Sequence, residues 1–413
     1  MSQKILFISA LMGLGHIRAL RPLALRFNRN VLLLGQTKVS DSSDKKFWSK
    51  SLRIYEWFSN ASQLPIIGRL LFWFLDIFLY IGPLKETTRG AKTSFSLFLL
   101  DYTIKRGICK EIDNLNNPFN ILVTSFYAPV SHMTRNRPQT PVVCQVCDTD
   151  LSRAWVPSSP NIGNVHYIST CKRSSYRLRE YGVEASKIHL LGFPLPDELV
   201  GGDSQEIAIN NYNRRYAKLN NDSILNARTP LKIAYPIGGA GVMVDNGIKA
   251  AIGLKSLVVE GKIELVFVPS PNNSSVNKLN KFKDTHFADC PNLIIANSTN
   301  LDGYFTLFNR ILANTHILWT KPSELTFYSG LGIPIIMCPP LGAQERCNRE
   351  WLLANEIGVD QLNPLKSKGW LVGMFYSGLL AQMARNGWEC GRRTALYNVE
   401  RLIEDILNET VEG

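Results

Sequence analysis

The stretch KILFISALMGLGHIRALRPLA, residues 4–24, predicts how the first half of the chain folds. Its apolar run ILFI is typical of a strand buried on both faces of a sheet, and the residues after the glycines recur at helical spacing. Between strand and helix stand Gly13 and Gly15, which let the backbone turn tightly and approach a ligand, and His16 follows directly. Strand, glycine turn and helix open a βαβ unit, whose helix N-terminus offers N–H groups to an anion.

A dinucleotide-binding fingerprint does not fit this turn. Such a fingerprint needs a third glycine at the position of Arg18, and no acidic residue clearly closes the next strand. A turn that serves only strand–helix packing remains open on this stretch alone. The purpose of His16 therefore has to be inferred from the rest of the chain.

Short apolar runs alternate with helical segments along the whole chain. They read KILFIS, NVLLLG, NILVTS, PVVCQV, VHYIST and KIHLLG, then LKIAYPI, IELVFVP, NLIIANS, HILWTK and IPIIMCPP. This alternation predicts an α/β fold with mainly parallel sheets, and 413 residues exceed a single core. We expect two doubly wound domains, residues 1–200 and 229–413, joined by a polar linker at 201–228. The last helix is allowed to pack back on the first domain, and ligands are expected in a cleft between the domains.

The positive charge is concentrated in the first half. Residues 1–200 hold 25 Lys and Arg against 14 Asp and Glu, a balance of +11, whereas residues 201–413 hold 21 against 20, a balance of +1. Such an excess indicates an anionic partner, either a membrane surface or nucleic acid. No zinc finger, helix-turn-helix pattern or RNA-binding aromatic motif is present, so nucleic acid is not expected.

An aromatic apolar segment, LPIIGRLLFWFLDIFLYIGPL at 64–84, lies in the same half. It is short for a membrane span and carries Arg69 and Asp76 on one helix face. A buried core helix and a lipid-facing patch anchored by aromatic side chains both remain open.

Cysteine usage and the N-terminus predict a cytoplasmic protein. Eight cysteines are scattered along the chain, and only four apolar residues follow Lys4 before the turn, too few for a signal peptide. Cys144 and Cys147 form C-x-x-C without a second pair at zinc-site spacing, and VVCQVC is also typical of a buried strand. His286 and Cys290 make no better ligand set. We therefore expect no metal site.

Polar and glycine residues follow three strands of the second half. Gly238, Gly239 and Gly241 form a second glycine turn that is able to expose backbone amides to a phosphate. WTKPSEL ends a strand and starts a helix with Ser323 as the expected cap. PPLGAQERCN leads from a third strand into a further helix. Polar residues gathered after apolar strands favour a functional role.

These motifs, in this order, resemble glycosyltransferases of the GT-B fold close to glycosyltransferase family 28, which includes monogalactosyldiacylglycerol synthase and the peptidoglycan GlcNAc transferase. KPSELT, GLGIPII and PPLGAQERCN resemble the donor half, and PVVCQVCDTDLSRAWVP with KIHLLGFPL resembles the end of the acceptor half. The opening glycine turn with its histidine matches a third motif. The resemblance implies two Rossmann-like domains and an inverting transfer from a nucleotide sugar, usually a UDP-sugar, without a cofactor or an obligatory metal.

The resemblance also implies roles for individual residues. Helix N-termini at glycine turns hold a diphosphate without a cation, and His16 removes the acceptor proton near neutral pH, with Asp148 orienting or replacing it. Gly13 and Gly15 lie on the acceptor side. The donor side comprises Gly238, Gly239, Gly241, Ser323, Glu324, Thr326, Gln344 and Glu345. Together with the basic first half, this predicts a lipid or membrane-associated acceptor and peripheral attachment to an anionic membrane.

The chain departs from the family at one position. Where the family has an acidic residue that binds the ribose hydroxyls, this chain has Ser329, and Glu324 is a carboxylate at a different point on the same helix that is a candidate to compensate. A non-catalytic GT-B partner or regulatory protein is therefore an alternative function. A nucleotide-sugar epimerase is another, with Asp148, Asp150, Glu324 and Glu345 as the obvious carboxylates.

Overall fold

The computed structural model describes residues 4–61, 81–84, 95–115, 118–221, 229–238, 241, 243–271 and 275–412. Most of the aromatic segment 64–84, the end of the predicted linker at 222–228, and Gly239 lie outside the described residues. The chain forms two compact units. The first comprises Met1–Leu195, Gly342–Cys347 and Arg392–Gly413, and the second comprises Pro196–Leu341 and Asn348–Gly391.

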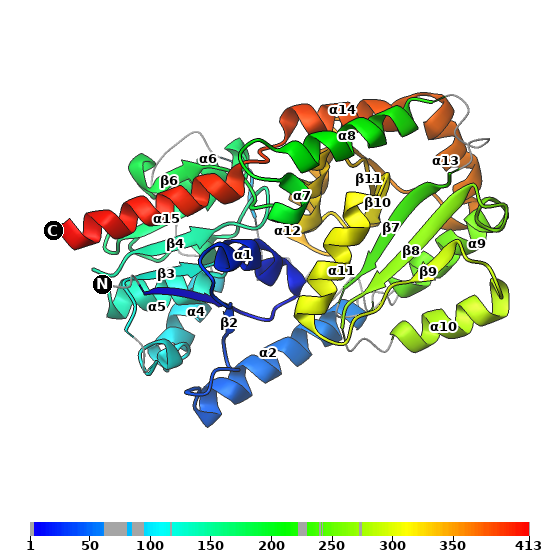
Figure 1. The fold of residues 1–413 in the computed structure, drawn as a ribbon. Coiled ribbons are helices and arrows are strands. Elements are labelled where there is room, and N and C mark those ends of the chain that lie inside the picture. The colour runs from blue at the N-terminus through cyan, green and yellow to red at the C-terminus, as the bar shows by residue number, and fades with distance from the viewer. Residues whose placement is uncertain are drawn as a thin grey trace. The chain divides into compact units, whose positions relative to one another are not determined.

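The first unit is built on a parallel six-stranded sheet of order β2-β1-β3-β4-β5-β6 (Figure 1). Its strands are β1 (Ile5–Ser9), β2 (Leu32–Leu33), β3 (Ile121–Thr124), β4 (Val142–Gln145), β5 (Val165–Ser169) and β6 (Ile188–Leu190). Its α-helices are α1 (Leu14–Arg26), α2 (Ser42–Ala61), α4 (Phe95–Lys105), α5 (Tyr127–Asn136), α6 (Lys172–Glu180) and α15 (Ala395–Glu412). Short 3₁₀ turns are η1 (Lys110–Ile112), η2 (Arg153–Trp155) and η3 (Ala185–Lys187).

The second unit repeats this plan with the sheet order β12-β11-β10-β7-β8-β9, again with parallel pairs. Its strands are β7 (Leu231–Ile237), β8 (Ile263–Pro269), β9 (Leu293–Ile295), β10 (Ile317–Thr320), β11 (Ile335–Met337) and β12 (Gly358–Asp360). Its helices are α7 (Asp197–Val200), α8 (Glu206–Leu219), α9 (Val244–Val259), α10 (Ser275–His286), α11 (Leu301–Ala313), α13 (Ser367–Tyr376) and α14 (Leu379–Cys390), with 3₁₀ segments η5 (Glu324–Leu331) and η6 (Pro364–Lys366). Helix α12 (Ala343–Ala354) begins in the first unit and ends in the second.

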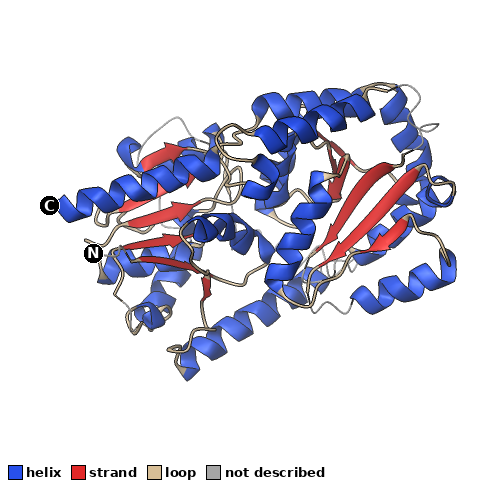
Figure 2. Cartoon of the chain, in the orientation of Figure 1, coloured by secondary structure: helices blue, strands red, loops and turns tan. Residues whose placement is uncertain are grey.

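The predicted α/β class is confirmed, since helices flank both sheets (Figure 2). Each of the eleven apolar runs contains one strand. The strand that sequence reasoning missed is β12, whose three residues GVD carry a single large apolar side chain. Such a short edge strand shows no periodicity, and it forms because β11 offers it a hydrogen-bonding partner.

The division between the units lies between Leu195 and Pro196 rather than within 201–228. Half of the predicted linker forms α8, in which Arg215 is buried and donates to the main-chain carbonyls of Thr315 and Leu331 at 2.6 Å each. Burial lowers the pKa of Arg215 to about 9, a cost that its carbonyl partners offset. The polar composition of this stretch therefore reflects an amphipathic helix.

The C-terminal helix α15 packs against α1 in the first unit. Arg26 at the end of α1 forms an ion pair with Glu400, with 2.8 Å between Nε and Oε2. The same guanidinium lies over the ring of Tyr397 at 5.6 Å. Hydrogen bonding, cation–π attraction and apolar contact thus join the two ends of the chain in one unit.

A buried ion cluster anchors the loop that follows β4. Asp150 is fully buried and accepts from Arg177 Nε at 2.8 Å and from Arg173 Nε at 2.8 Å. Burial alone lowers the pKa of Arg177, but its hydrogen bond to Asp150 and that charge raise it overall. Arg177 also donates to the carbonyls of Gly82 and Pro83, and so holds the described end of segment 64–84.

Replacing Asp150→Asn is expected to lower the free energy of unfolding by about 3–5 kcal/mol, because it removes the buried carboxylate that holds both Arg173 and Arg177 and leaves Arg177 with Glu180 as its remaining ionic partner. The midpoint of urea unfolding measures this loss. Glu389→Gln is the matched control, since it breaks an exposed pair with Arg385 and should leave the midpoint in place. Equal midpoints for the two variants would contradict a structural role for Asp150.

Candidate functional site

The first candidate site lies where the strand order of the first sheet reverses. Strand β1 is flanked by β2 on one side and β3 on the other, so the connections that follow β1 and β2 leave in opposite directions. Parallel sheets bind ligands at such a point, beyond the carboxyl ends of the strands. The segment after β1 carries Gly13, Gly15 and His16, and the segment after β3 begins with Ser125.

The glycine turn is made by Gly13 alone. Gly13 is the N-cap of α1 with φ 89° and ψ 169°, a conformation that is essentially restricted to glycine. Helix α1 then begins at Leu14, so Gly15 and His16 are its second and third residues rather than part of the turn. The helix starts earlier than the apolar spacing indicated, because glycine and histidine in a first turn add nothing to a hydrophobic pattern.

His16 is held by Ser125 through two hydrogen bonds. His16 Nδ1 lies 2.6 Å from the main-chain oxygen of Ser125, and Ser125 Oγ donates to the main-chain oxygen of His16 at 2.7 Å. Ser125 Oγ also lies 2.9 Å from Ser9 Oγ at the end of β1. The imidazole contacts Phe126 edge-to-face, with ring centroids 4.9 Å apart. Position and orientation of the ring are thus set by the ends of two neighbouring strands.

This contact determines the tautomer of His16. A carbonyl oxygen only accepts hydrogen bonds, so the 2.6 Å contact requires a proton on Nδ1. In the neutral ring the lone pair is then on Nε2, the nitrogen that is able to remove a proton. The ring is thus oriented by a main-chain carbonyl, with its basic nitrogen at Nε2.

The carboxyl end of β4 adds Cys147 and Asp148 to this edge of the sheet. Cys147 Sγ lies 3.6 Å from His16 Nδ1, which brings the second cysteine of the C-x-x-C pair next to the histidine. Asp148 is half-buried, and its main-chain oxygen accepts from Thr170 Oγ1 at 2.6 Å. Burial raises the pKa of Cys144 well above its ordinary value, so that thiol stays protonated within the strand.

The second candidate site lies at the corresponding point of the second sheet, between β7 and β10. The loop after β7 is folded by a hydrogen bond from Gly241 N to Gly238 O at 2.9 Å, and Gly241 has φ 66°. Helix α9 then begins at Val244 without a side-chain cap. Lys321 directly follows β10, the neighbouring strand. A glycine loop, a helix N-terminus and a cation thus share one edge, an arrangement suited to an anion.

A buried polar network holds this loop against the sheet. Tyr235 OH donates to the main-chain oxygen of Met243 at 3.2 Å and accepts from Asn246 Nδ2 at 2.8 Å. Asn246 and the side chain of Gln361 exchange two further bonds of 2.8 Å, and Trp319 Nε1 donates to Gln361 at 2.8 Å. The network joins β7, α9, β10 and the segment after β12. Sequence reasoning missed it, because two of its members, Asn246 and Gln361, are 115 residues apart.

The segment after β10 carries three of the predicted donor residues. Ser323 caps η5, as predicted, by accepting from Leu325 N at 3.5 Å. Glu324 is half-buried. Thr326 is fully buried, and its hydroxyl has no hydrogen-bond partner among the described residues. A buried polar group in that state is unusual, and a bound ligand or water supplies the partner in many proteins.

Ser329, the position of the expected acidic residue, is buried against α14. A side chain at Gly387 would lie 2.5 Å from the main-chain oxygen of Ser329, so η5 and α14 pack backbone to backbone here. An acidic side chain at this position would be enclosed by that contact. Ser329 thus lies where η5 packs closely on α14.

Gln344 and Glu345 are the second and third residues of α12 and are half-buried. They follow β11 and belong to the part of α12 that clusters with the first unit. Gly238 and Ser323 belong to the second unit. Among the described residues no group of three His, Cys, Asp or Glu is arranged to hold a metal, and no helix there is long and apolar enough to cross a bilayer.

Gly13→Ala is expected to lower the free energy of unfolding by about 1–3 kcal/mol, because alanine is strained at this φ and ψ. Urea unfolding measures the change. Gly373→Ala is the control: no atom lies within 4 Å of the added methyl, and alanine favours the helix there. A Gly13→Ala protein as stable as the parent would show that the turn does not depend on glycine.

Comparison with protein-family models and with curated proteins finds no match to this sequence. Solved structures do match along the whole chain. The calicheamicin glycosyltransferase CalG4 aligns with a TM-score of 0.53 at 10% identity, covering 99% of both chains. UDP-GlcNAc 2-epimerase from Neisseria meningitidis, bound to UDP-GlcNAc, aligns with a TM-score of 0.50 at 11% identity, covering 97% of this chain and 100% of that one. The S. aureus MnaA–UDP structure aligns with 0.50 at 12%, covering 98% and 97%. With its two parallel sheets, the chain has the GT-B fold.

Proposed function

We propose that this protein is an inverting glycosyltransferase, related to family 28, which moves a sugar from a UDP-sugar to a hydroxyl of a lipid or membrane-associated acceptor. The observation that carries the proposal is the 2.6 Å contact between His16 Nδ1 and the Ser125 carbonyl. It leaves a basic nitrogen at the reversal point of the first sheet, where parallel sheets bind ligands.

In the proposed reaction, Nε2 of His16 takes the proton of the acceptor hydroxyl while its oxygen attacks the anomeric carbon of the sugar. The bond from that carbon to the diphosphate breaks in the same displacement, so the configuration inverts. Negative charge grows on the leaving diphosphate, and preorganised N–H groups stabilise it. Asp148 orients His16 or takes its place.

The second unit is the proposed donor side. Gly238, Gly241 and the start of α9 contribute backbone N–H groups to the diphosphate, and Lys321 adds a positive charge without a metal. The buried hydroxyl of Thr326 gains a partner when the donor binds. Gln344 and Glu345 contact the sugar of the donor. Ser323 and Glu324, which stand in the same segment as Thr326, also belong to the donor side.

A UDP-sugar epimerase is the alternative that shares this fold. Epimerisation requires groups that remove a proton from carbon and return one, and carboxylates commonly serve that purpose. Asp150, one of the four carboxylates considered, is buried between two arginines and is thereby committed to structure. This favours transfer over epimerisation. Incubation of UDP-GlcNAc without an acceptor distinguishes them, since only an epimerase converts the sugar.

The acceptor is proposed to be a lipid because the first half of the chain carries the charge excess of +11 and the aromatic segment 64–84. Basic residues near an anionic leaflet contribute about 1 kcal/mol each, and this attraction weakens with salt. Sedimentation with anionic vesicles at low and high salt measures it.

His16→Ala is expected to lower turnover by about 10²–10⁴-fold while the affinity for UDP stays the same, because the base is lost and the donor side is untouched. Steady-state kinetics and calorimetry measure the two quantities. The control is His286→Ala, which changes an exposed histidine of α10. Turnover within a few-fold of the parent would exclude His16 as the base, and Asp148→Asn would be examined next.

Gly238→Val is expected to weaken UDP binding at least about tenfold, because the side chain blocks the backbone from the diphosphate. The fold should survive, since no atom lies within 4 Å of an added Cβ at Gly238. Gly369→Val, at an equally open position in α13, is the control. Calorimetry with UDP measures the change, and equal affinity for parent and Gly238→Val would place the diphosphate elsewhere.

A further inference from the structure

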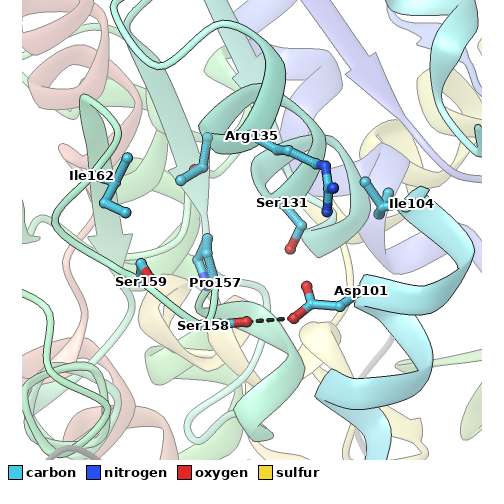
Figure 3. A pocket seen from close by; sticks show the side chains of 9 residues that line it. Asp101, Ile104, Ser131, Arg135, Pro157, Ser158, Ser159 and Ile162 are labelled. Atoms are coloured by element: carbon cyan, nitrogen blue, oxygen red, sulfur yellow. Dashed lines mark hydrogen bonds between the residues drawn. The ribbon is translucent and has the colours of Figure 1, made fainter.

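A pocket lies in the first unit, between α4, α5 and the loop that leads into β5 (Figure 3). It is a cavity of about 290 Å³. Thr134 and Arg135 come from the last turn of α5, and Ile162 stands three residues before β5. Because α5 begins at the carboxyl end of β3 and runs back along the sheet, the pocket lies toward the amino ends of the strands, away from the edge that holds His16.

Two buried hydroxyls of this pocket lack hydrogen-bond partners among the described residues. Ser131 and Thr134 are 6% and 8% exposed, and neither Ser131 Oγ nor Thr134 Oγ1 has a partner. Helical serine and threonine commonly donate to a carbonyl in the preceding turn, but these two do not. Figure 3 shows the Ser131 hydroxyl directed into the pocket. Such groups cost about 1–3 kcal/mol each when unsatisfied, so the pocket is built for a partner.

The rest of the lining combines opposite charges with further hydroxyls. Asp101 of α4 accepts a hydrogen bond from Ser158, and Arg135 approaches the same space from α5 (Figure 3). Ser159 adds another hydroxyl. A carboxylate accepts, a guanidinium donates, and a hydroxyl does both. The pocket therefore suits a ligand whose own groups both donate and accept.

Apolar side chains complete the pocket. Ile104 and Pro157 are buried beside it, and Ile162 is 65% exposed at its mouth. Pockets for drug-sized ligands measure about 300–1,000 Å³, so this one has room for a single ring and not for a nucleotide sugar. Polar groups around aliphatic surface match the hydroxyls and C–H faces of one pyranose.

We propose that this pocket binds one uncharged sugar ring, as a free monosaccharide or as a terminal unit of a glycan. The sugar hydroxyls bond Ser131 Oγ, Thr134 Oγ1 and the carboxylate of Asp101, and its apolar face packs on Ile162. A zwitterion such as an amino acid would pair with Asp101 and Arg135 but would leave the two buried hydroxyls without a specific role. The proposal does not rest on the proposed sugar transfer.

The experiment titrates the full chain with glucose, galactose, mannose and N-acetylglucosamine and detects binding by saturation-transfer NMR. Glycine and alanine are titrated in the same way as zwitterionic probes. Saturable binding of at least one sugar is expected. The titration is repeated with UDP, which occupies the proposed donor side. Sugar binding that persists with UDP supports the pocket, whereas binding abolished by UDP assigns the sugar to the donor side and overturns the proposal.

Variants locate the binding. Thr134→Val keeps the shape and removes a hydroxyl, so sugar affinity should fall about fivefold, and Asp101→Asn should lower it about tenfold. Thr285→Val is the matched control on α10, whose exposed hydroxyl bonds Lys281. Unchanged sugar affinity in both Thr134→Val and Asp101→Asn overturns the proposal. Binding of the zwitterions alone overturns it too. Binding of none of the probes also overturns it and leaves water as the occupant of the pocket. UDP affinity stays at the parent value in each variant, so failure here is distinct from failure of the transferase proposal.

Discussion

Within each sheet the strands run in one direction, and the rest of the structure depends on that constraint. Every segment that follows a strand emerges at the same edge, whatever its distance along the chain. His16 and Ser125 are 109 residues apart, yet they meet because β1 and β3 are neighbours in register. In the second unit the same rule brings the segments after β7 and β10 together. The order and direction of the strands thus decide which residues meet at these edges, and the side chains then form the contacts between them.

The main-chain carbonyl of Ser125 orients the histidine. A carbonyl accepts from Nδ1 and so fixes the tautomer of the imidazole without itself adding a negative charge. Ser125 makes two hydrogen bonds with His16: its main-chain carbonyl accepts from the imidazole, and its hydroxyl donates to the main-chain oxygen of His16. This reciprocal pair ties the first turn of α1 to the end of β3. Gly13, whose backbone has a positive φ that glycine adopts without strain, starts the helix at the point where that pair forms.

Asp150 and Ser329 show that packing can give a residue of a sequence motif a structural role. Asp150 follows a strand end, where functional groups gather, yet two arginines enclose it and give it a structural task. Ser329 stands at a ligand-binding position of the resembling family, yet the contact between Gly387 and its backbone leaves little space for a larger polar group. In both cases the neighbouring residue that sets the surroundings belongs to another element: the two arginines of α6 for Asp150, and Gly387 of α14 for Ser329.

The sequence by itself determined the fold class and most of the strands, because a strand buried on both faces must be a continuous apolar run. It also located Gly13 and Ser323, because a helix start has a local chemical signature. It did not show β12, whose three residues depend on β11 for pairing, or α8, whose polar stretch is structured by Arg215 reaching carbonyls about a hundred residues away. Nor did it show that Cys147 lies beside His16 or that Tyr235 and Gln361 support the second glycine loop. These facts were decided only by the tertiary structure, since they arise from strand order and register, which no local pattern encodes.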